Sequence, residues 1–146
     1  MSRPLSPPNR RPKVLLVDRD ADLRAALTFS LELDGYQVEA LASGEGLLAR
    51  TLPGRNACLV IDDKLGDVSG LETLGILRRR GVGLPAVLVT NRAHPALLAR
   101  AGELDARVVE KPLLGDALTL QIQSLLPSHA GGGPGAAGRR RVRRST

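Results

Sequence analysis

The stretch that decides the fold of this chain is Cys58-Leu-Val-Ile-Asp-Asp63, a short apolar run that ends abruptly in two carboxylates. Charges at the carboxyl end of a buried strand are costly unless they perform chemistry or hold a cation. Two other strand-like runs also end in a charged residue, namely Val14-Leu-Leu-Val-Asp18 and Arg107-Val-Val-Glu-Lys111. Because strand ends converge on one crevice in an open parallel α/β sheet, we expect these charged residues to share a site.

Elsewhere the chain alternates apolar strand-like runs with amphipathic helical runs. This alternation predicts an α/β fold with a five-stranded parallel sheet and helices on both faces. The expected strands are Val14–Val17, Gln37–Leu41, Ala57–Ile61, Ala86–Thr90 and Arg107–Glu110. The expected helices cover about Ala21–Leu33 with Asp20 or Asp22 as its cap, a stretch between Ser43 and Pro53-Gly54, Leu71–Arg79, a stretch starting at Pro95, and about Gly115–Leu126.

The two ends of the chain differ in composition from its middle. Residues 1–12 carry four prolines and predict a disordered leader, and residues 128–146 predict a flexible glycine-rich linker with an arginine-rich tail. Residues 13–127 are expected to form one folded domain. The formal net charge is +6, but nine of the 21 Lys and Arg residues lie at the ends. This leaves 12 basic and 15 acidic residues between positions 14 and 138, so nucleic-acid binding is expected only weakly, through the basic tail.

The sequence also argues against several classes of protein. No apolar run approaches the ~20 residues of a membrane-spanning helix, and the proline-rich start lacks the apolar segment of a signal peptide. We therefore expect a cytoplasmic protein. Cys58 is the only cysteine, so no internal disulfide can form, and its place in an apolar strand indicates a small buried hydrophobe.

Five short motifs follow one another at or just after the predicted strand ends. They are Val17-Asp18, Leu59-Val-Ile-Asp62, Asp67-Val-Ser-Gly70-Leu-Glu72, Val87-Leu-Val-Thr90 and Glu110-Lys111-Pro112. Their order and spacing resemble the receiver domain of response regulators, the phosphoacceptor half of bacterial two-component systems. The resemblance covers residues 13 to about 126. It implies a doubly wound, flavodoxin-like sheet with the strand order 2-1-3-4-5.

The resemblance also implies roles for individual residues. Asp62 matches the family's phosphoacceptor and Asp18 matches its acidic neighbour. Thr90 and Lys111 match the residues that bind the phosphoryl group and switch in response to it. A carboxylate can attack phosphorus and form an acyl phosphate when nearby groups neutralise the charge on the phosphoryl oxygens.

The family also uses a magnesium ion, whose oxygen ligands match the two aspartates above and the backbone carbonyl of Lys64. Arg19, however, stands where the family carries a second ligating acid, and a guanidinium cannot bind a metal. We hypothesise that Arg19 reaches toward Asp62 and weakens or abolishes the dependence on Mg2+. A second possibility stays open, in which a neighbouring acid, Asp20 or Asp63, supplies the missing oxygen.

Three further positions bear on the loops and the switch. Gly66 stands where the family often has proline, so the loop after the third strand is expected to be looser. Val108 replaces the family's aromatic switch residue, so we expect no signalling by ring rotation. The Lys111–Pro112 peptide bond, in contrast, is expected to be cis by the same resemblance.

Partners follow from the resemblance as well. His94 precedes Pro95 in a predicted loop and His129 lies in the linker, so neither is placed in mid-helix as a phosphotransfer histidine would be. The donor is therefore expected on another protein, a histidine kinase or a histidine phosphotransfer protein. Since no output domain is recognised after Leu126, the chain resembles regulators that act by docking on a downstream protein target.

Two alternative functions remain open at this point. A pseudo-receiver would keep the fold as a binding module but lose phosphorylation, and Arg19 and Val108 favour it. A haloacid-dehalogenase-like phosphohydrolase would use Asp18 as nucleophile and Asp20 as acid and base. The order of the lysine and the acidic pair differs from that family, and the chain lacks a cap domain, so we expect no enzyme of this kind.

Overall fold

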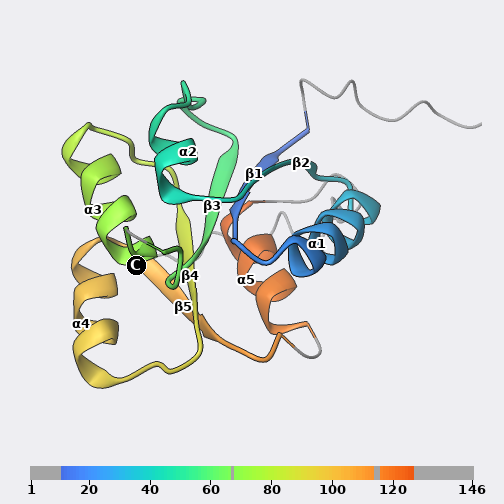
Figure 1. The fold of residues 1–146 in the computed structure, drawn as a ribbon. Coiled ribbons are helices and arrows are strands. Elements are labelled where there is room, and N and C mark those ends of the chain that lie inside the picture. The colour runs from blue at the N-terminus through green and yellow to red at the C-terminus, as the bar shows by residue number, and fades with distance from the viewer. Residues whose placement is uncertain (1–10, 67, 114–115, 127–146) are drawn as a thin grey trace, which may run out of the picture.

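The structure is a computed structural model that describes residues 11–66, 68–113 and 116–126. Strands and helices alternate along this part of the chain (Figure 1). The strands are β1 Lys13–Val17, β2 Gln37–Leu41, β3 Ala57–Asp62, β4 Ala86–Thr90 and β5 Ala106–Glu110. The helices are α1 Ala21–Leu33, α2 Gly44–Leu48, α3 Gly70–Arg79, α4 Pro95–Glu103 and α5 Ala117–Leu125. Nearly all of the expected leader and the expected linker and tail lie outside the described residues.

All strand pairs are parallel, and the sheet order is β2-β1-β3-β4-β5. The expected α/β class and the 2-1-3-4-5 order are therefore confirmed. The register pairs Val17 with Ile61, Asp62 with Val89, and Thr90 with Glu110. The carboxyl ends of β1, β3, β4 and β5 thus lie along one edge, where parallel α/β sheets place their sites.

Helices cover both faces of the sheet, with α1 and α5 on one face and α2, α3 and α4 on the other (Figure 1). Alternate residues of the same strand pack into different clusters, because successive side chains of a strand point to opposite faces. Val14 and Leu16 of β1 pack with α1 and α5, whereas Leu15 and Val17 pack with α2 and α3. Burial on both faces explains why the central strands are continuous apolar runs.

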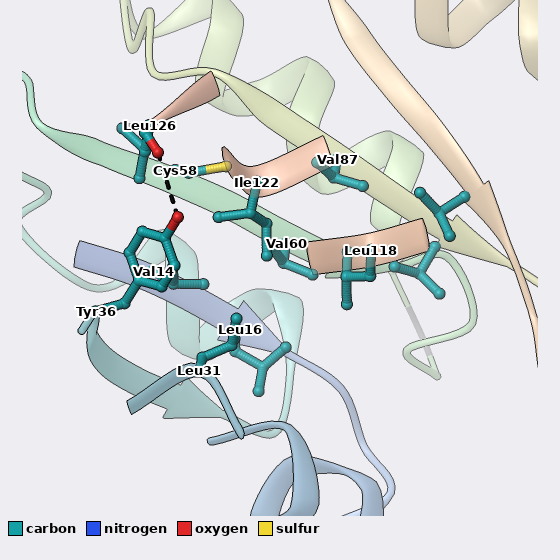
Figure 2. Close-up of a cluster of buried hydrophobic side chains, with 12 residues drawn as sticks. Val14, Leu16, Leu31, Tyr36, Cys58, Val60, Val87, Leu118, Ile122 and Leu126 are labelled. Atoms are coloured by element: carbon teal, nitrogen blue, oxygen red, sulfur yellow. Dashed lines mark hydrogen bonds between the residues drawn. The ribbon is translucent and has the colours of Figure 1, made fainter. Parts of the chain in front are cut away.

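Figure 2 shows the cluster on the α1 and α5 face, where Tyr36 joins the end of the α1–β2 turn to the end of α5. The buried Tyr36 hydroxyl donates a hydrogen bond of 3.2 Å to the backbone carbonyl of Leu126 (Figure 2). Cys58 lies in the same cluster as a fully buried free thiol, which confirms its expected role in packing. Burial raises the pKa of the Cys58 thiol to about 12, although the charge of Arg107 lowers it slightly.

Local sequence signals explain most helix boundaries. Asp20 caps α1 by accepting hydrogen bonds from the backbone amides of Asp22 and Leu23, so the cap is the first of the two expected acids. Helix α3 begins with a capping box formed by Ser69 and Glu72.

Two helix boundaries differ from expectation. Helix α2 ends at Leu48, well before the expected stop at Pro53-Gly54, because Ala49 closes the last turn and the chain then leads to β3. Helix α5 begins at Ala117, and Gly115 lies outside the described residues. In the part of the chain that the structure describes, no helix is both long enough and apolar enough to cross a membrane.

Candidate functional site

The side chains of Asp18, Asp62 and Lys111 meet at the carboxyl edge of the sheet. The Lys111 ammonium lies 2.8 Å from Asp62 Oδ1 and 3.7 Å from Asp18 Oδ2. Both carboxylates are buried, with Asp18 3% and Asp62 5% exposed. The expected convergence of these three residues is therefore present, with one cation bridging two buried anions.

The strand ends and the backbone fix these positions. Asp62 is the last residue of β3, and Asp18 directly follows β1, its amide donating to the carbonyl of Leu41 in β2 at 3.0 Å. Lys111 directly follows β5, and its amide donates to the carbonyl of Thr90 at 2.7 Å. The Lys111–Pro112 peptide bond is cis, as expected.

Burial and charge shape the protonation of the pair. Burial raises the pKa of Asp62, and the neighbouring charge of Asp18 raises it further. Hydrogen bonds from Lys111 and from the backbone of Lys64 lower this pKa, but the net shift is upward. Burial alone would lower the pKa of Lys111, but its hydrogen bond with Asp62 and the charges of both aspartates raise it. The lysine therefore stays charged over the whole physiological range.

Thr90 lies at the same edge, buried at the end of β4. Its hydroxyl bonds to the following loop, donating to the carbonyl of Arg92 and accepting from the Arg92 amide, each at 3.3 Å. The hydroxyl is thus engaged with the loop backbone.

Arg19 does not approach Asp62 as we hypothesised. Its side chain is exposed, and within the described residues it forms no ion pair or hydrogen bond. The position follows β1 on the solvent side, and a guanidinium is favoured in water over a buried site that already holds a lysine.

Asp20 and Asp63, the two acids considered as substitute metal ligands, each hold a helix terminus. Asp20 Oδ1 caps α1, and Asp63 Oδ1 accepts the amide of Leu71 in the first turn of α3 at 3.1 Å. These bonds point one oxygen of each carboxylate toward helix amides, which favours structural roles for both residues.

Three residues at this edge were given no individual role from the sequence, although Gly70 and Glu110 belong to two of the quoted motifs. Arg24 Nη1 donates to the backbone carbonyl of Asp18 at 2.7 Å. Gly70 packs against the backbone of Asp62, and Glu110 Oε2 accepts the amide of Ala93 at 2.9 Å. The sequence does show a glycine at the start of a predicted helix, Gly70, and a charge next to Lys111, Glu110. The partners of these two residues, however, depend on loop conformation, which the sequence does not show.

Two positions at which the sequence differs from the family pattern, Gly66 and Val108, have structural explanations. Gly66 has a φ of +106°, which proline cannot adopt because its ring fixes φ near −65°. Val108 lies half-buried in β5 and packs against the cluster of Leu88, Leu97 and Ala101. A branched aliphatic side chain in this cluster has no ring to rotate.

The donor set at the edge fits magnesium only in part. Asp18 and Asp62 offer carboxylate oxygens, and Mg2+ is commonly held by one or two carboxylates together with water. Within the described part of the chain, no group of three or more acidic, histidine or cysteine side chains could hold a metal ion. The two buried carboxylates are therefore the part of a magnesium site that the described side chains provide.

Comparison with known sequences gives a consistent picture. The sequence model of the family described as "Response regulator receiver domain" matches residues 14–123. The transcriptional regulatory protein FixJ of Rhizobium meliloti is 31% identical over 102 residues, which are 68% of this chain and 49% of FixJ. The chain thus spans about half the length of this relative.

Solved structures with similar folds include two receivers. The response regulator TrrA from Thermotoga maritima, in complex with Mg2+ and BeF, has a TM-score of 0.68 and 25% identity, covering 78% of this chain and 98% of TrrA. The non-phosphorylated receiver domain of HemR from Leptospira biflexa has a TM-score of 0.73 and 25% identity, covering 79% of this chain and 94% of that domain.

Proposed function

Because this chain belongs to the family of response regulator receiver domains, we propose that it takes a phosphoryl group from a histidine kinase or a histidine phosphotransfer protein onto Asp62. The observation that carries the proposal is the 2.8 Å contact between the Lys111 ammonium and Asp62 Oδ1, with Asp18 beside them. A receiver is a signalling module rather than a classical enzyme. Residues 13–127 would make up this module.

The reaction is a transfer between two side chains. A carboxylate oxygen of Asp62 attacks phosphorus while the bond from phosphorus to the donor's histidine nitrogen breaks, and that nitrogen keeps the electron pair. Lys111 supplies a compact positive charge to the phosphoryl oxygens. The Thr90 hydroxyl can donate a hydrogen bond to the new phosphoryl group once it leaves Arg92.

Magnesium, when bound, would neutralise charge on the phosphoryl oxygens. Asp18, Asp62 and the backbone carbonyl of Lys64 are the groups proposed to hold it. The exposed Arg19 places no carboxylate at this edge, so we propose a weaker magnesium site than one with a third acidic ligand.

Signalling would proceed through protein contacts. We propose a downstream protein target that docks on the receiver, and residence in the cytoplasm, where histidine kinases present their phosphoryl groups. The basic tail adds at most a weak, salt-dependent attraction to nucleic acid.

Two competing functions have less support. A phosphohydrolase would need Asp20 as its acid and base, but Asp20 is exposed and caps α1. A pseudo-receiver would explain Arg19, but it does not explain why Lys111 is held against two buried carboxylates, an arrangement that is costly unless it is used.

The test is incubation of the full chain with acetyl phosphate, with and without Mg2+, followed by mass spectrometry of the labelled site. We expect label on Asp62 in the wild type and none in Asp62→Asn. Asp63→Asn is the matched control, because it changes the adjacent acid and can still accept the Leu71 amide; it should keep the label. Label on Asp18 instead, or no label under any condition, would contradict the proposal.

A further inference from the structure

The loop between β4 and α4 is fastened to the sheet by two side chains. At its start, the Thr90 hydroxyl exchanges hydrogen bonds with the backbone of Arg92. One residue further on, the amide of Ala93 donates to the carboxylate of Glu110, which is the last residue of β5. The loop is therefore tied both to its own strand and to the strand that carries Lys111.

The two attachments differ in strength. Both Thr90 contacts are 3.3 Å long, beyond the usual range for hydrogen bonds of a hydroxyl group. The bond from Ala93 to Glu110 is 2.9 Å long and has an ionised acceptor, although its exposure to solvent reduces the gain from that charge. Glu110 thus makes the shorter, charge-assisted attachment.

Only the weaker attachment conflicts with the reaction. A hydroxyl has one hydrogen to donate, so Thr90 cannot donate to Arg92 and to a phosphoryl oxygen at the same time. Turning toward Asp62 requires Thr90 to leave the loop backbone. Whether the loop follows depends on the bond that remains, which is the one to Glu110.

The position of Glu110 connects this bond to the site. Glu110 is paired in register with Thr90 and directly precedes Lys111, whose amide donates to the Thr90 carbonyl at 2.7 Å. The Glu110 side chain therefore extends from the residue before Lys111, past the end of β4, to the amide of Ala93.

We propose that Glu110 is a positioning residue that holds the β4–α4 loop in the conformation in which the Thr90 hydroxyl faces Arg92. It thereby sets how readily Thr90 reaches a phosphoryl group on Asp62, in a receiver in which Val108 provides no aromatic ring. This inference rests on the proposed function for its consequence, but the hold on the loop does not depend on phosphorylation.

The first measurement uses unphosphorylated protein. Glu110→Ala removes the acceptor, Glu110→Gln keeps an oxygen acceptor without the charge, and Glu32→Ala removes an exposed charge from α1 on the other face. By NMR, the amide of Ala93 should exchange with solvent about three- to tenfold faster in Glu110→Ala, as expected for loss of one hydrogen bond. The Thr90 methyl signal should shift in the same variant. Glu110→Gln should lie between wild type and Glu110→Ala, because it keeps the oxygen acceptor but loses its charge. Glu32→Ala should stay within about twofold of wild type.

The second measurement is the rate of labelling of Asp62 by acetyl phosphate in the same variants. Faster labelling of Glu110→Ala, by about twofold or more, is expected if a released loop frees Thr90. The inference would be overturned if the exchange rate of the Ala93 amide were unchanged in Glu110→Ala, or if Glu32→Ala raised that rate equally. It would also be overturned if the Ala93 amide exchanged faster in Glu110→Ala while the labelling rate of Asp62 stayed the same. A wild type that takes no label would end the proposed function instead, while the Ala93 and Thr90 signals would still decide whether Glu110 holds the loop.

Discussion

Gly70 packs so closely against Asp62 that a methyl group on it would lie 2.4 Å from the Asp62 carbonyl oxygen. The same helix terminus is bonded to the next residue, since the Gly70 amide donates to the carbonyl of Asp63 at 2.9 Å. The first turn of α3 thus fixes the backbone of the proposed phosphoacceptor, and only glycine permits this approach.

Gly70→Ala should therefore lower the free energy of unfolding by about 1–3 kcal/mol, because α3 or the Asp62 backbone must move. Gly102→Ala is the matched control, a helical glycine in α4 with no atom within 4 Å of the added methyl. That variant should be stabilised by up to about 1 kcal/mol through helix propensity. Urea unfolding measures both, and equal stability of the two variants would contradict the close contact.

The pH dependence of Asp62→Asn follows from the raised pKa of Asp62. In the folded state the buried carboxyl holds its proton more tightly than in the unfolded chain, where the pKa is near 3.8. The stability that this tighter proton binding by Asp62 contributes is therefore fully present below pH 3.8. It is lost as the pH rises through the folded-state pKa of Asp62.

The stability of Asp62→Asn relative to wild type should thus increase with pH across this window and then level off. Unfolding curves collected from pH 3.5 to pH 7 test this. Asp22→Asn, at an exposed position in α1, serves as the control for the loss of one surface charge. A difference between Asp62→Asn and wild type that stays constant with pH would contradict the assignment.

The sequence predicted the five strands, the sheet order and the meeting of Asp18, Asp62 and Lys111. The strands and the meeting of the three side chains depend on hydrophobic periodicity and on the rule that parallel strands end at one edge, and both are visible in a sequence. The sheet order, in contrast, was implied by the resemblance to receiver domains. The sequence predicted that Asp20 or Asp22 caps α1, because capping depends on residues two or three positions apart, and the structure selects Asp20.

The sequence did not predict the orientation of Arg19 or the contact between Glu110 and Ala93. Each depends on a side-chain rotamer or a loop conformation, and these are decided by neighbours far apart in the sequence. We hypothesised that Arg19 reaches toward Asp62, but solvation of an exposed guanidinium outweighs a small gain beside Lys111.

Alkaline stability should depend on Tyr36. Burial raises the pKa of Tyr36 from 10.0 to about 12, and the charges of Asp34 and Cys58 add to the shift. The unfolded chain releases this proton first, so stability that is present below pH 10 is lost between pH 10 and about pH 12. The loss should be about 2–3 kcal/mol.

Tyr36→Phe removes this titration and also the hydrogen bond to Leu126 that is drawn in Figure 2. At neutral pH this variant should be less stable than wild type by about 1 kcal/mol. Between pH 10 and pH 12 the wild type should lose more stability than Tyr36→Phe. Parallel losses in the two proteins would show that another group controls alkaline unfolding.

Arg19 offers a direct test of the weakened magnesium site. Its side chain is exposed and makes no hydrogen bond or ion pair with the residues described by the structure, so Arg19→Ala should change the free energy of unfolding by less than about 0.5 kcal/mol. Arg19→Asp adds an anionic oxygen at a position beside Asp18 and removes a positive charge. Both changes favour a hard divalent cation.

Calorimetric titration with Mg2+ should therefore give the order Arg19→Asp, then Arg19→Ala, then wild type, with about tenfold or more between the first and the last. The alanine variant separates the two effects, because it removes the cation without adding a ligand. Equal affinities for Arg19→Asp and Arg19→Ala would mean that a carboxylate at position 19 does not reach the ion. Wild-type affinity as high as that of Arg19→Asp would mean that Asp18, Asp62 and backbone oxygen suffice, and that Arg19 has no effect on the metal.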